Sequence, residues 1–200
     1  MCPVALAAQT IDPGVEPSPF EVQGFVGVLQ PLANLSENPD AFGTVLTPNV
    51  AFGAEATLWV SPRLGLSAGG VLSPTDLDAF ATQAPGTIEL PEDLGSATWA
   101  AGTVSLTYRI VTSGSAGSVE PYFALGGGIR HVSFDEIAEP EAESATDPAA
   151  TLAAGLRIEV LDGLLMRIEV RDVASFYASP VTDEDKLQND VLVTLGLGFR

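Results

Sequence analysis

The charged residues with the most regular spacing lie in the stretch LLMRIEVRD, residues 164–172. Arg167, Glu169 and Arg171 occupy every other position, with apolar side chains between them. In a β-strand this spacing puts the charges on one face and the apolar side chains on the other. Only 8 of the 200 residues are Lys or Arg, so two arginines in one strand are a large share. Charges of both signs on one face predict ion pairs and charge-assisted hydrogen bonds.

Sequence patterns for cofactors, metals and disulfides are absent. The single cysteine, Cys2, excludes an intrachain disulfide. The glycine-rich stretches GLGF and LGGGIR lie inside strand patterns, so they do not form phosphate-binding loops. The acidic stretch FDEIAEPEAESATDP, residues 134–148, lacks the spaced ligands and central glycine of a calcium loop. We interpret it as a solvated loop, with weak divalent-cation binding as the alternative, and we expect no cofactor.

Length and composition are consistent with one domain. The chain is 46% hydrophobic with a mean hydropathy of +0.28, although its net charge is -18. No apolar run reaches the ~18 residues of a membrane-spanning helix, whereas a transmembrane β-strand needs only ~9–11 alternating residues. The acidic balance argues against nucleic acid as a partner, because phosphate binding needs clustered Lys and Arg.

The first residues differ in character from the rest. MCPVALAAQT has a short apolar run that ends in small residues, like the tail of a secretory signal, but it lacks a basic start. IDPGVEPSPF contains three prolines and predicts an extended segment. We therefore expect residues 1–19 to be an export-signal remnant or an extended lead-in, and residues 20–200 to form the folded domain.

Alternation with period two recurs in eight segments, and the connections between them alternate between long and short. The segments are 20–29, 50–60, 64–72, 97–110, 122–132, 150–160, 165–175 and 190–199. The long connections are 30–49, 73–96, 133–148 and 176–189. This arrangement predicts an all-β fold, a closed eight-stranded antiparallel up-and-down transmembrane barrel with every long loop at one end. The long connections contain 16 of the 26 acids and one base, Lys186, which predicts an acidic external end.

The composition of the two strand faces indicates which one contacts lipid. One face carries mainly Gly, Ala, Ser and Thr, which would be an unusual water-exposed surface but suits the narrow interior of an eight-stranded barrel. The apolar face then points outward, with an aromatic girdle at Phe20, Tyr108, Phe123 and Phe199 near the short turns. An outward Arg near the membrane centre costs ~2–4 kcal/mol, so the strand charges must face inward. We expect an interior network of Glu21, Glu55, Arg109, Arg130, Arg157, Glu159, Arg167, Glu169, Arg171 and Asp190.

The sixth and seventh segments allow a prediction of strand register. Pairing Val160 with Met166 would match the two faces, and it would place Glu159 opposite Arg167 and Arg157 opposite Glu169. Asp172 does not fit, because a strand continuing in phase points it toward lipid. We expect a bulge at positions 171 and 172, or a place at the outer rim.

The chain resembles the small eight-stranded outer-membrane barrels of Gram-negative bacteria, the OmpA- and OmpX-like group. FEVQGFVGV (20–28), PYFALGGGIR (121–130) and DVLVTLGLGFR (190–200) carry the resemblance. It implies residence in the outer membrane as a monomer, with lipid bilayer, lipopolysaccharide and the assembly machinery as partners. That group usually ends on an aromatic residue, whereas Phe199 is followed here by Arg200.

His131 and Ser133, in RHVSF, resemble the His-x-Ser arrangement of outer-membrane lipid A deacylases. The resemblance implies His131 as base and Ser133 as nucleophile, although the asparagine that commonly follows the serine is missing and no carboxylate can be assigned. We expect instead a histidine at the lipid-water boundary. The leading hypothesis is a non-enzymatic structural or surface-interaction protein. A narrow channel for small solutes, the lipid A esterase and a soluble ligand-binding barrel with reversed faces are the alternatives.

Overall fold

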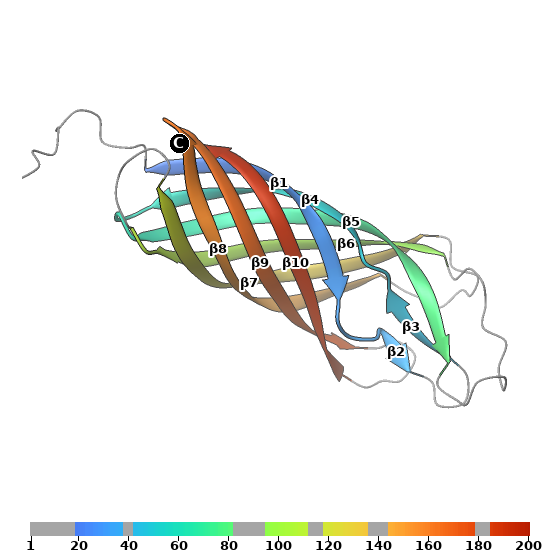
Figure 1. The fold of residues 1–200 in the computed structure, drawn as a ribbon. Coiled ribbons are helices and arrows are strands. Elements are labelled where there is room, and N and C mark those ends of the chain that lie inside the picture. The colour runs from blue at the N-terminus through green and yellow to red at the C-terminus, as the bar shows by residue number, and fades with distance from the viewer. Residues whose placement is uncertain (1–18, 38–41, 82–94, 112–117, 136–143, 179–184) are drawn as a thin grey trace, which may run out of the picture.

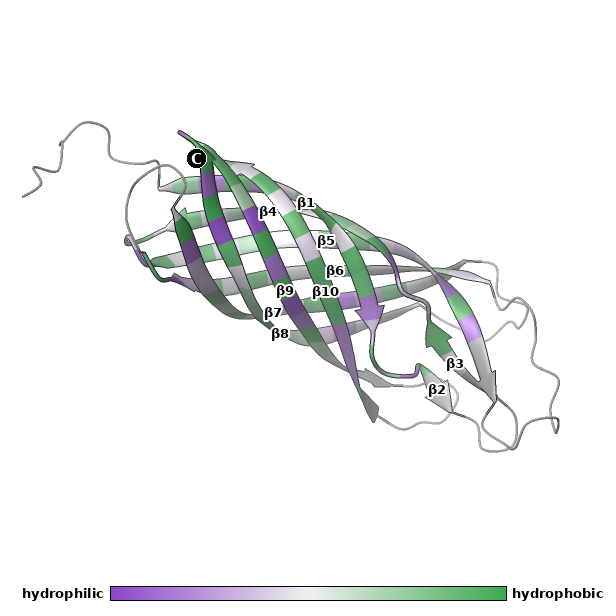
Figure 2. Cartoon of the chain, in the orientation of Figure 1, coloured by the Kyte–Doolittle hydropathy of each residue, from purple (hydrophilic) through white to green (hydrophobic). Residues whose placement is uncertain are grey.

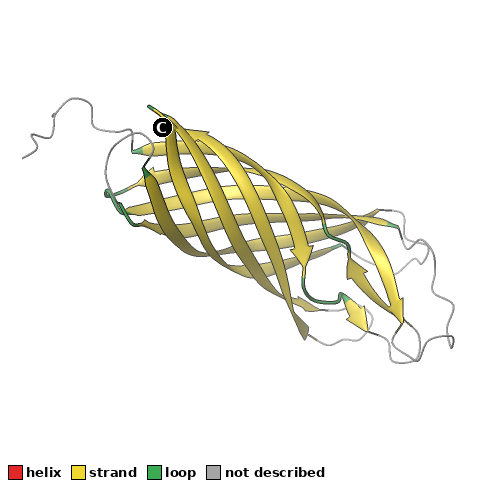
Figure 3. Ribbon diagram, in the orientation of Figure 1, coloured by secondary structure: helices red, strands yellow, loops and turns green. Residues whose placement is uncertain are grey.

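A computed structural model describes residues 19–37, 42–81, 95–111, 118–135, 144–178 and 185–200 of the chain. All regular structure in these ranges is β-strand (Figure 3). Eight long strands correspond to the eight expected segments, and most extend beyond them toward the long loops. They are β1 (Phe20–Pro31), β4 (Asn49–Trp59), β5 (Leu64–Ala81), β6 (Ser96–Arg109), β7 (Val119–Asp135), β8 (Ala145–Leu161), β9 (Leu164–Ala178) and β10 (Asp185–Phe199). No described residue belongs to a helix that could cross a membrane.

The eight strands close into an antiparallel barrel (Figure 1). The sheet order is β5-β4-β1-β10-β9-β8-β7-β6, and pairing of β5 with β6 closes it. A path of directly opposed residues leaves β1 at Phe20 and passes once around the barrel through the seven other strands. It returns to β1 at Gln30. The stagger is therefore 30 − 20 = 10 residues, which with eight strands gives the tilted, narrow barrel seen in Figure 1. The predicted fold class is confirmed.

The two faces of the wall are arranged as expected: hydropathy alternates along the strands (Figure 2), and large apolar residues are exposed on the outside. The four predicted girdle residues all point outward, with exposures between 45% for Tyr108 and 67% for Phe199. Thr, Ser and charged side chains at the alternate positions are buried inside. Hydrophobic exposure on this scale, wrapped around the whole barrel, is what a lipid-facing surface requires.

The first long connection folds back onto the barrel mouth and contains two short strands that the sequence did not predict. These are β2 (Ser36–Glu37) and β3 (Phe42–Leu46), and β3 pairs with the end of β5. Leu35 and Leu46 are buried in this region, and the Gln188 amide donates a 2.7 Å hydrogen bond to the Asn34 carbonyl. The described part of this connection thus packs against the upper interior through Leu35 and Leu46.

The predicted register of β8 and β9 is wrong. Arg157 lies opposite Arg167 and Glu159 lies opposite Leu165, so neither expected pair of opposite charges is formed between directly opposed residues. The cause is the turn, which has only two residues between the paired Leu161 and Leu164, with Gly163 at a φ of 76°. With so short a turn, inward residues of β8 would lie opposite outward residues of β9. An irregularity between Glu159 and Leu161 shifts the register by one residue, so that inward residues lie opposite inward residues along the rest of the two strands.

Asp172 was expected either to need a bulge or to lie at the outer rim, and the expected bulge is absent. It pairs with Leu152 on one side and Val191 on the other without any shift in register. Strand β9 therefore continues in phase, and Asp172 shares the outward face with Ile168 and Val170. Of the predicted acidic external end, ten acids lie outside the described residues, while Asp76 and Asp78 are exposed on β5.

Candidate functional site

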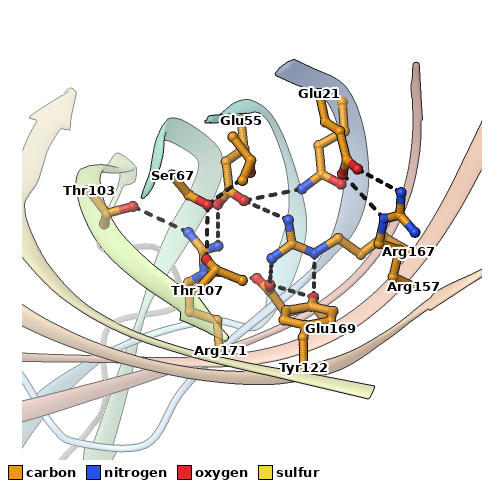
Figure 4. A network of polar contacts seen from close by, with 12 residues as sticks. Glu21, Glu55, Ser67, Thr103, Thr107, Tyr122, Arg157, Arg167, Glu169 and Arg171 are labelled. Atoms are coloured by element: carbon orange, nitrogen blue, oxygen red, sulfur yellow. Dashed lines mark hydrogen bonds and ion pairs between the residues drawn. The ribbon is translucent and has the colours of Figure 1, made fainter. Parts of the chain in front are cut away.

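A central cluster of four charges, Glu55, Arg167, Glu169 and Arg171, crosses the barrel interior (Figure 4). The Glu55 carboxylate lies 2.6 Å from Arg167 Nη1 and 2.5 Å from Arg171 Nη2. Glu169 lies 2.6 Å from Arg167 Nη2 and 2.8 Å from Arg171 Nε. Each carboxylate thus bridges both guanidinium groups, and the four charges sum to zero. This arrangement supplies the several partners that a buried charge needs.

Tyr122 extends the central cluster to β7. Its hydroxyl donates a 2.7 Å hydrogen bond to Glu169 and accepts one from Arg167 Nε. The Arg167 guanidinium lies over the Tyr122 ring, 4.1 Å from its centroid. The ring occupies the space beside Gly155, the directly opposed residue on β8, where a Cβ atom would overlap it. A glycine on one strand therefore makes room for an aromatic side chain from the next.

A lower cluster of Glu21, Arg109, Glu120 and Arg157 lies nearer the short turns. Arg157 lies 2.6 Å from both Glu21 and Glu120. Arg109 lies 3.4 Å from Glu120 and also donates a 2.6 Å hydrogen bond to the Pro62 carbonyl in the first short turn. The four charges again sum to zero. Ionic contacts here join β1, β6, β7 and β8 across the interior.

The upper half of the interior contains an apolar cluster beside buried polar side chains such as Ser73, Ser175 and Gln188, whereas the sequence predicted a polar lumen throughout. The apolar cluster comprises Leu29, Leu35, Leu46, Ala51, Val71, Leu77, Ala97, Trp99, Ala101, Val132, Ala149, Val173 and Leu192. Within it lies one upper pair, Arg130 and Asp190, whose side chains are completely buried and 2.6 Å apart. Trp99 Nε1 donates a 2.8 Å hydrogen bond to the same Asp190 oxygen. The upper pair thus anchors β6, β7 and β10 to one another.

All ten predicted interior charges take part in ion pairs within the barrel. Glu159 pairs with Arg200 at 2.6 Å, so the residue that follows Phe199 connects β10 to β8. The sequence interpretation missed Glu120 and Asp147, because it began β7 and β8 too late. Asp147, assigned to an external loop, instead faces the interior 3.7 Å from Arg130.

The interior leaves little open space among these groups. A cavity of about 20 Å³ lies between the lower and central clusters, bordered by Gln23, Tyr122 and residues of both. That is room for about one water molecule. Side-chain hydroxyls of Thr57, Ser67 and Thr107 form a hydrogen-bonded row with distances of 2.8 and 2.9 Å, and Thr57 and Thr107 also border the cavity. The lower and central clusters therefore leave only this small cavity between them.

His131 and Ser133 both lie on the outward face of β7, as the sequence predicted. His131 Nδ1 is 2.7 Å from the Thr146 hydroxyl on β8. The partner of this imidazole is thus a hydroxyl group, and no carboxylate of the described residues forms a hydrogen bond or ion pair with it. Among the described residues, no group of three or more His, Cys, Asp or Glu side chains is placed to hold a metal ion.

Comparisons with known proteins identify the fold but not a sequence family. No family model and no curated protein matches the chain. Among solved structures, Neisserial surface protein A is 14% identical, with a TM-score of 0.64 over 91% of this chain and 97% of that one. The outer membrane protein OprG from Pseudomonas aeruginosa is also 14% identical, with a TM-score of 0.64 over 92% and 97%. The N-terminal β-barrel domain of Pseudomonas aeruginosa OprF is 10% identical, with a TM-score of 0.53 over 92% and 100%.

These similarities agree with the physical character of the barrel. The chain has the fold of the small eight-stranded outer-membrane barrels, and the resemblance expected from its sequence is confirmed at the level of fold. Its apolar outer wall and closed strand pairing suit a lipid bilayer, because they leave no strand edge of the barrel unpaired in hydrocarbon. The fold and the apolar outer wall together have the character that a membrane-spanning barrel requires.

Proposed function

We propose that this chain, with the fold of the small outer-membrane barrels, is a closed structural or surface-interaction protein and not a pore. The observation that supports this proposal is the filling of the interior by two ion-paired clusters and, above them, the apolar cluster. Among the described residues, six bases and seven acids form ion pairs inside the barrel, so this part of the lumen has almost no net charge to attract ions of either sign.

The length of the strands supports a role at the external surface. A transmembrane strand needs ~9–11 residues, whereas β5, β7 and β8 have 18, 17 and 17. The surplus lies toward the long connections, where β3 pairs with the end of β5. The barrel wall therefore continues past the bilayer and would present the long loops to external partners. Lipopolysaccharide and the assembly machinery remain our proposed partners, with the protein as a monomer.

Conductance tests the closed interior against the channel alternative. We expect the folded wild-type protein to insert into a planar bilayer without producing stepwise current, because the clusters leave room for about one water molecule. Insertion must be shown separately, by a heat-dependent shift in gel mobility of the same sample. Reproducible current steps from the inserted wild type would establish the channel and refute the closed interior.

We further propose that the chain is not an enzyme. A serine nucleophile needs a base that a third group orients, and His131 has the Thr146 hydroxyl at 2.7 Å in that position. We expect purified wild-type protein in lipid A micelles to release no fatty acid. If release is observed and is lost in Ser133→Ala but kept in the neighbouring outward variant Thr98→Ala, the esterase alternative is correct.

A further inference from the structure

Asp172 is an acid on the lipid-facing wall, and the interior network does not involve it. Its neighbours on the adjacent strands are Leu152 and Val191. Its Oδ1 is buried and accepts no hydrogen bond from any described residue. An outward carboxylate is unfavourable in hydrocarbon, so a polar partner from outside the chain would relieve a real cost.

The strand registers give the depth of Asp172 in the wall. Strands lie ~4.8 Å apart and are tilted by ~40° to the barrel axis. A step from one residue to the directly opposed residue on the next strand therefore rises by about 3 Å along the axis. Asp172 is six such steps from Phe20 of the lower girdle and thus about 19 Å above it, in an apolar band ~25 Å tall. Gln30 is eight steps away, about 25 Å above Phe20 and at the upper edge. Asp172 therefore lies just inside the external edge of the band.

Two further polar residues connect Asp172 to that edge. Gln30 and Asp172 flank Val191 on its two sides, and Asn189 is the next outward residue of β10. Asn189 Oδ1 is also buried and accepts no hydrogen bond from a described residue. Gln30, Asp172 and Asn189 form a polar notch that descends from the edge into the apolar band. The described arginines of the surrounding strands, at positions 157, 167 and 171, all face the interior.

We propose that the polar notch binds the headgroup of a membrane lipid that carries a primary ammonium. Such a group brings a positive charge and three N–H donors, which suits the half-buried Asp172 carboxylate and the exposed amide of Gln30. The buried Oδ1 atoms of Asp172 and Asn189 would become acceptors when these side chains turn outward toward the headgroup. A phosphate alone would be repelled by Asp172. The inference rests on the proposed placement of this barrel in a membrane, and it adds the chemistry of one lipid contact.

Stability in vesicles of defined composition tests the proposal. The full chain is folded into phosphatidylcholine vesicles with and without phosphatidylethanolamine, and its unfolding by urea is followed. Phosphatidylcholine is the matched probe, because its quaternary ammonium has the same charge but no N–H donor. We expect phosphatidylethanolamine to lower the equilibrium constant for unfolding of the wild type about tenfold relative to phosphatidylcholine alone. This is the effect expected of one charge-assisted hydrogen bond.

Three variants separate the notch from general effects of the bilayer. Asp172→Asn and Asp172→Leu should not be stabilised by phosphatidylethanolamine. The control Asp76→Asn changes an exposed acid on β5 and should be stabilised as much as the wild type. In phosphatidylcholine alone, Asp172→Leu should be more stable than the wild type, because it removes an outward acid. If phosphatidylethanolamine stabilised the wild type and Asp172→Leu equally, the proposal would be overturned.

Other occupants give different results. Stabilisation by phosphatidylglycerol that requires Mg²⁺ and is lost in Asp172→Leu would identify a cation-bridged phosphate instead. Stability that increases with the protein-to-lipid ratio would identify a second copy of the chain as the occupant of the polar notch. Absence of the heat-dependent gel shift in every vesicle would refute membrane residence and the notch together, whereas normal insertion without a headgroup effect would refute the notch alone.

Discussion

Replacing Glu55 with alanine is expected to lower the free energy of unfolding by ~3–5 kcal/mol, the usual effect of removing one partner from a buried ion pair. Glu55 is almost fully buried and contacts Arg167 and Arg171 at 2.6 and 2.5 Å. Without it, two guanidinium groups share the single carboxylate of Glu169. The loss is a large part of the ~5–15 kcal/mol expected for a whole domain. Urea unfolding in vesicles, with mobility in gels as the measure of folded barrel, gives the value.

Two further variants distinguish charge balance from simple loss of packing. Glu55→Leu combined with Arg171→Leu restores neutrality and leaves the 2.6 Å pair of Arg167 with Glu169, so it should be less harmful than Glu55→Ala alone. Asp76→Ala, at an exposed acid, should change stability by less than ~0.5 kcal/mol. If Glu55→Ala were no more harmful than Asp76→Ala, the central cluster would not be what holds these strands together.

The strands and their faces were predictable because each depends on a local pattern. Period-two alternation assigns a side of the wall to every residue within a strand, and all ten charges expected inside do face inward. The register between β8 and β9 was not predictable, because it depends on a two-residue turn at Asp162 and Gly163 and on one irregularity above it. Matching the faces left several registers open, and opposite charges favoured the wrong one.

The ion pairs that reach across the lumen could not be predicted from neighbouring strands. Glu21 binds Arg157 and Glu55 binds Arg171, pairs that are 136 and 116 residues apart and reach across the lumen. Such contacts depend on the stagger of the closed barrel, which no local pattern contains. One missed signal was available, however. Phe25, Trp59 and Tyr122 each face inward opposite a glycine, and that pairing marks where a large side chain fits inside the wall.

Replacing Asp190 with alanine is expected to be about as harmful as replacing Glu55, with a loss of ~3–5 kcal/mol. Arg130 would lose its 2.6 Å partner at a position completely shielded from solvent, and Trp99 would lose the acceptor of its indole N–H. Urea unfolding measures the loss. Asp190→Asn keeps an acceptor for Trp99 and should be less harmful, because only the charge is removed.

The fluorescence of Trp99 distinguishes the effect of Asp190→Ala from that of Glu55→Ala. The chain has two tryptophans, so a Trp59→Phe background leaves Trp99 as the only emitter. Asp190→Ala should shift the emission of the folded barrel to longer wavelength, because the charge left on Arg130 favours entry of water into the apolar cluster. Glu55→Ala should destabilise the barrel without this shift, since its contacts lie in the central cluster. If both variants shifted the emission equally, the interior would respond as one unit. The central cluster and the upper pair would then not stabilise the fold independently.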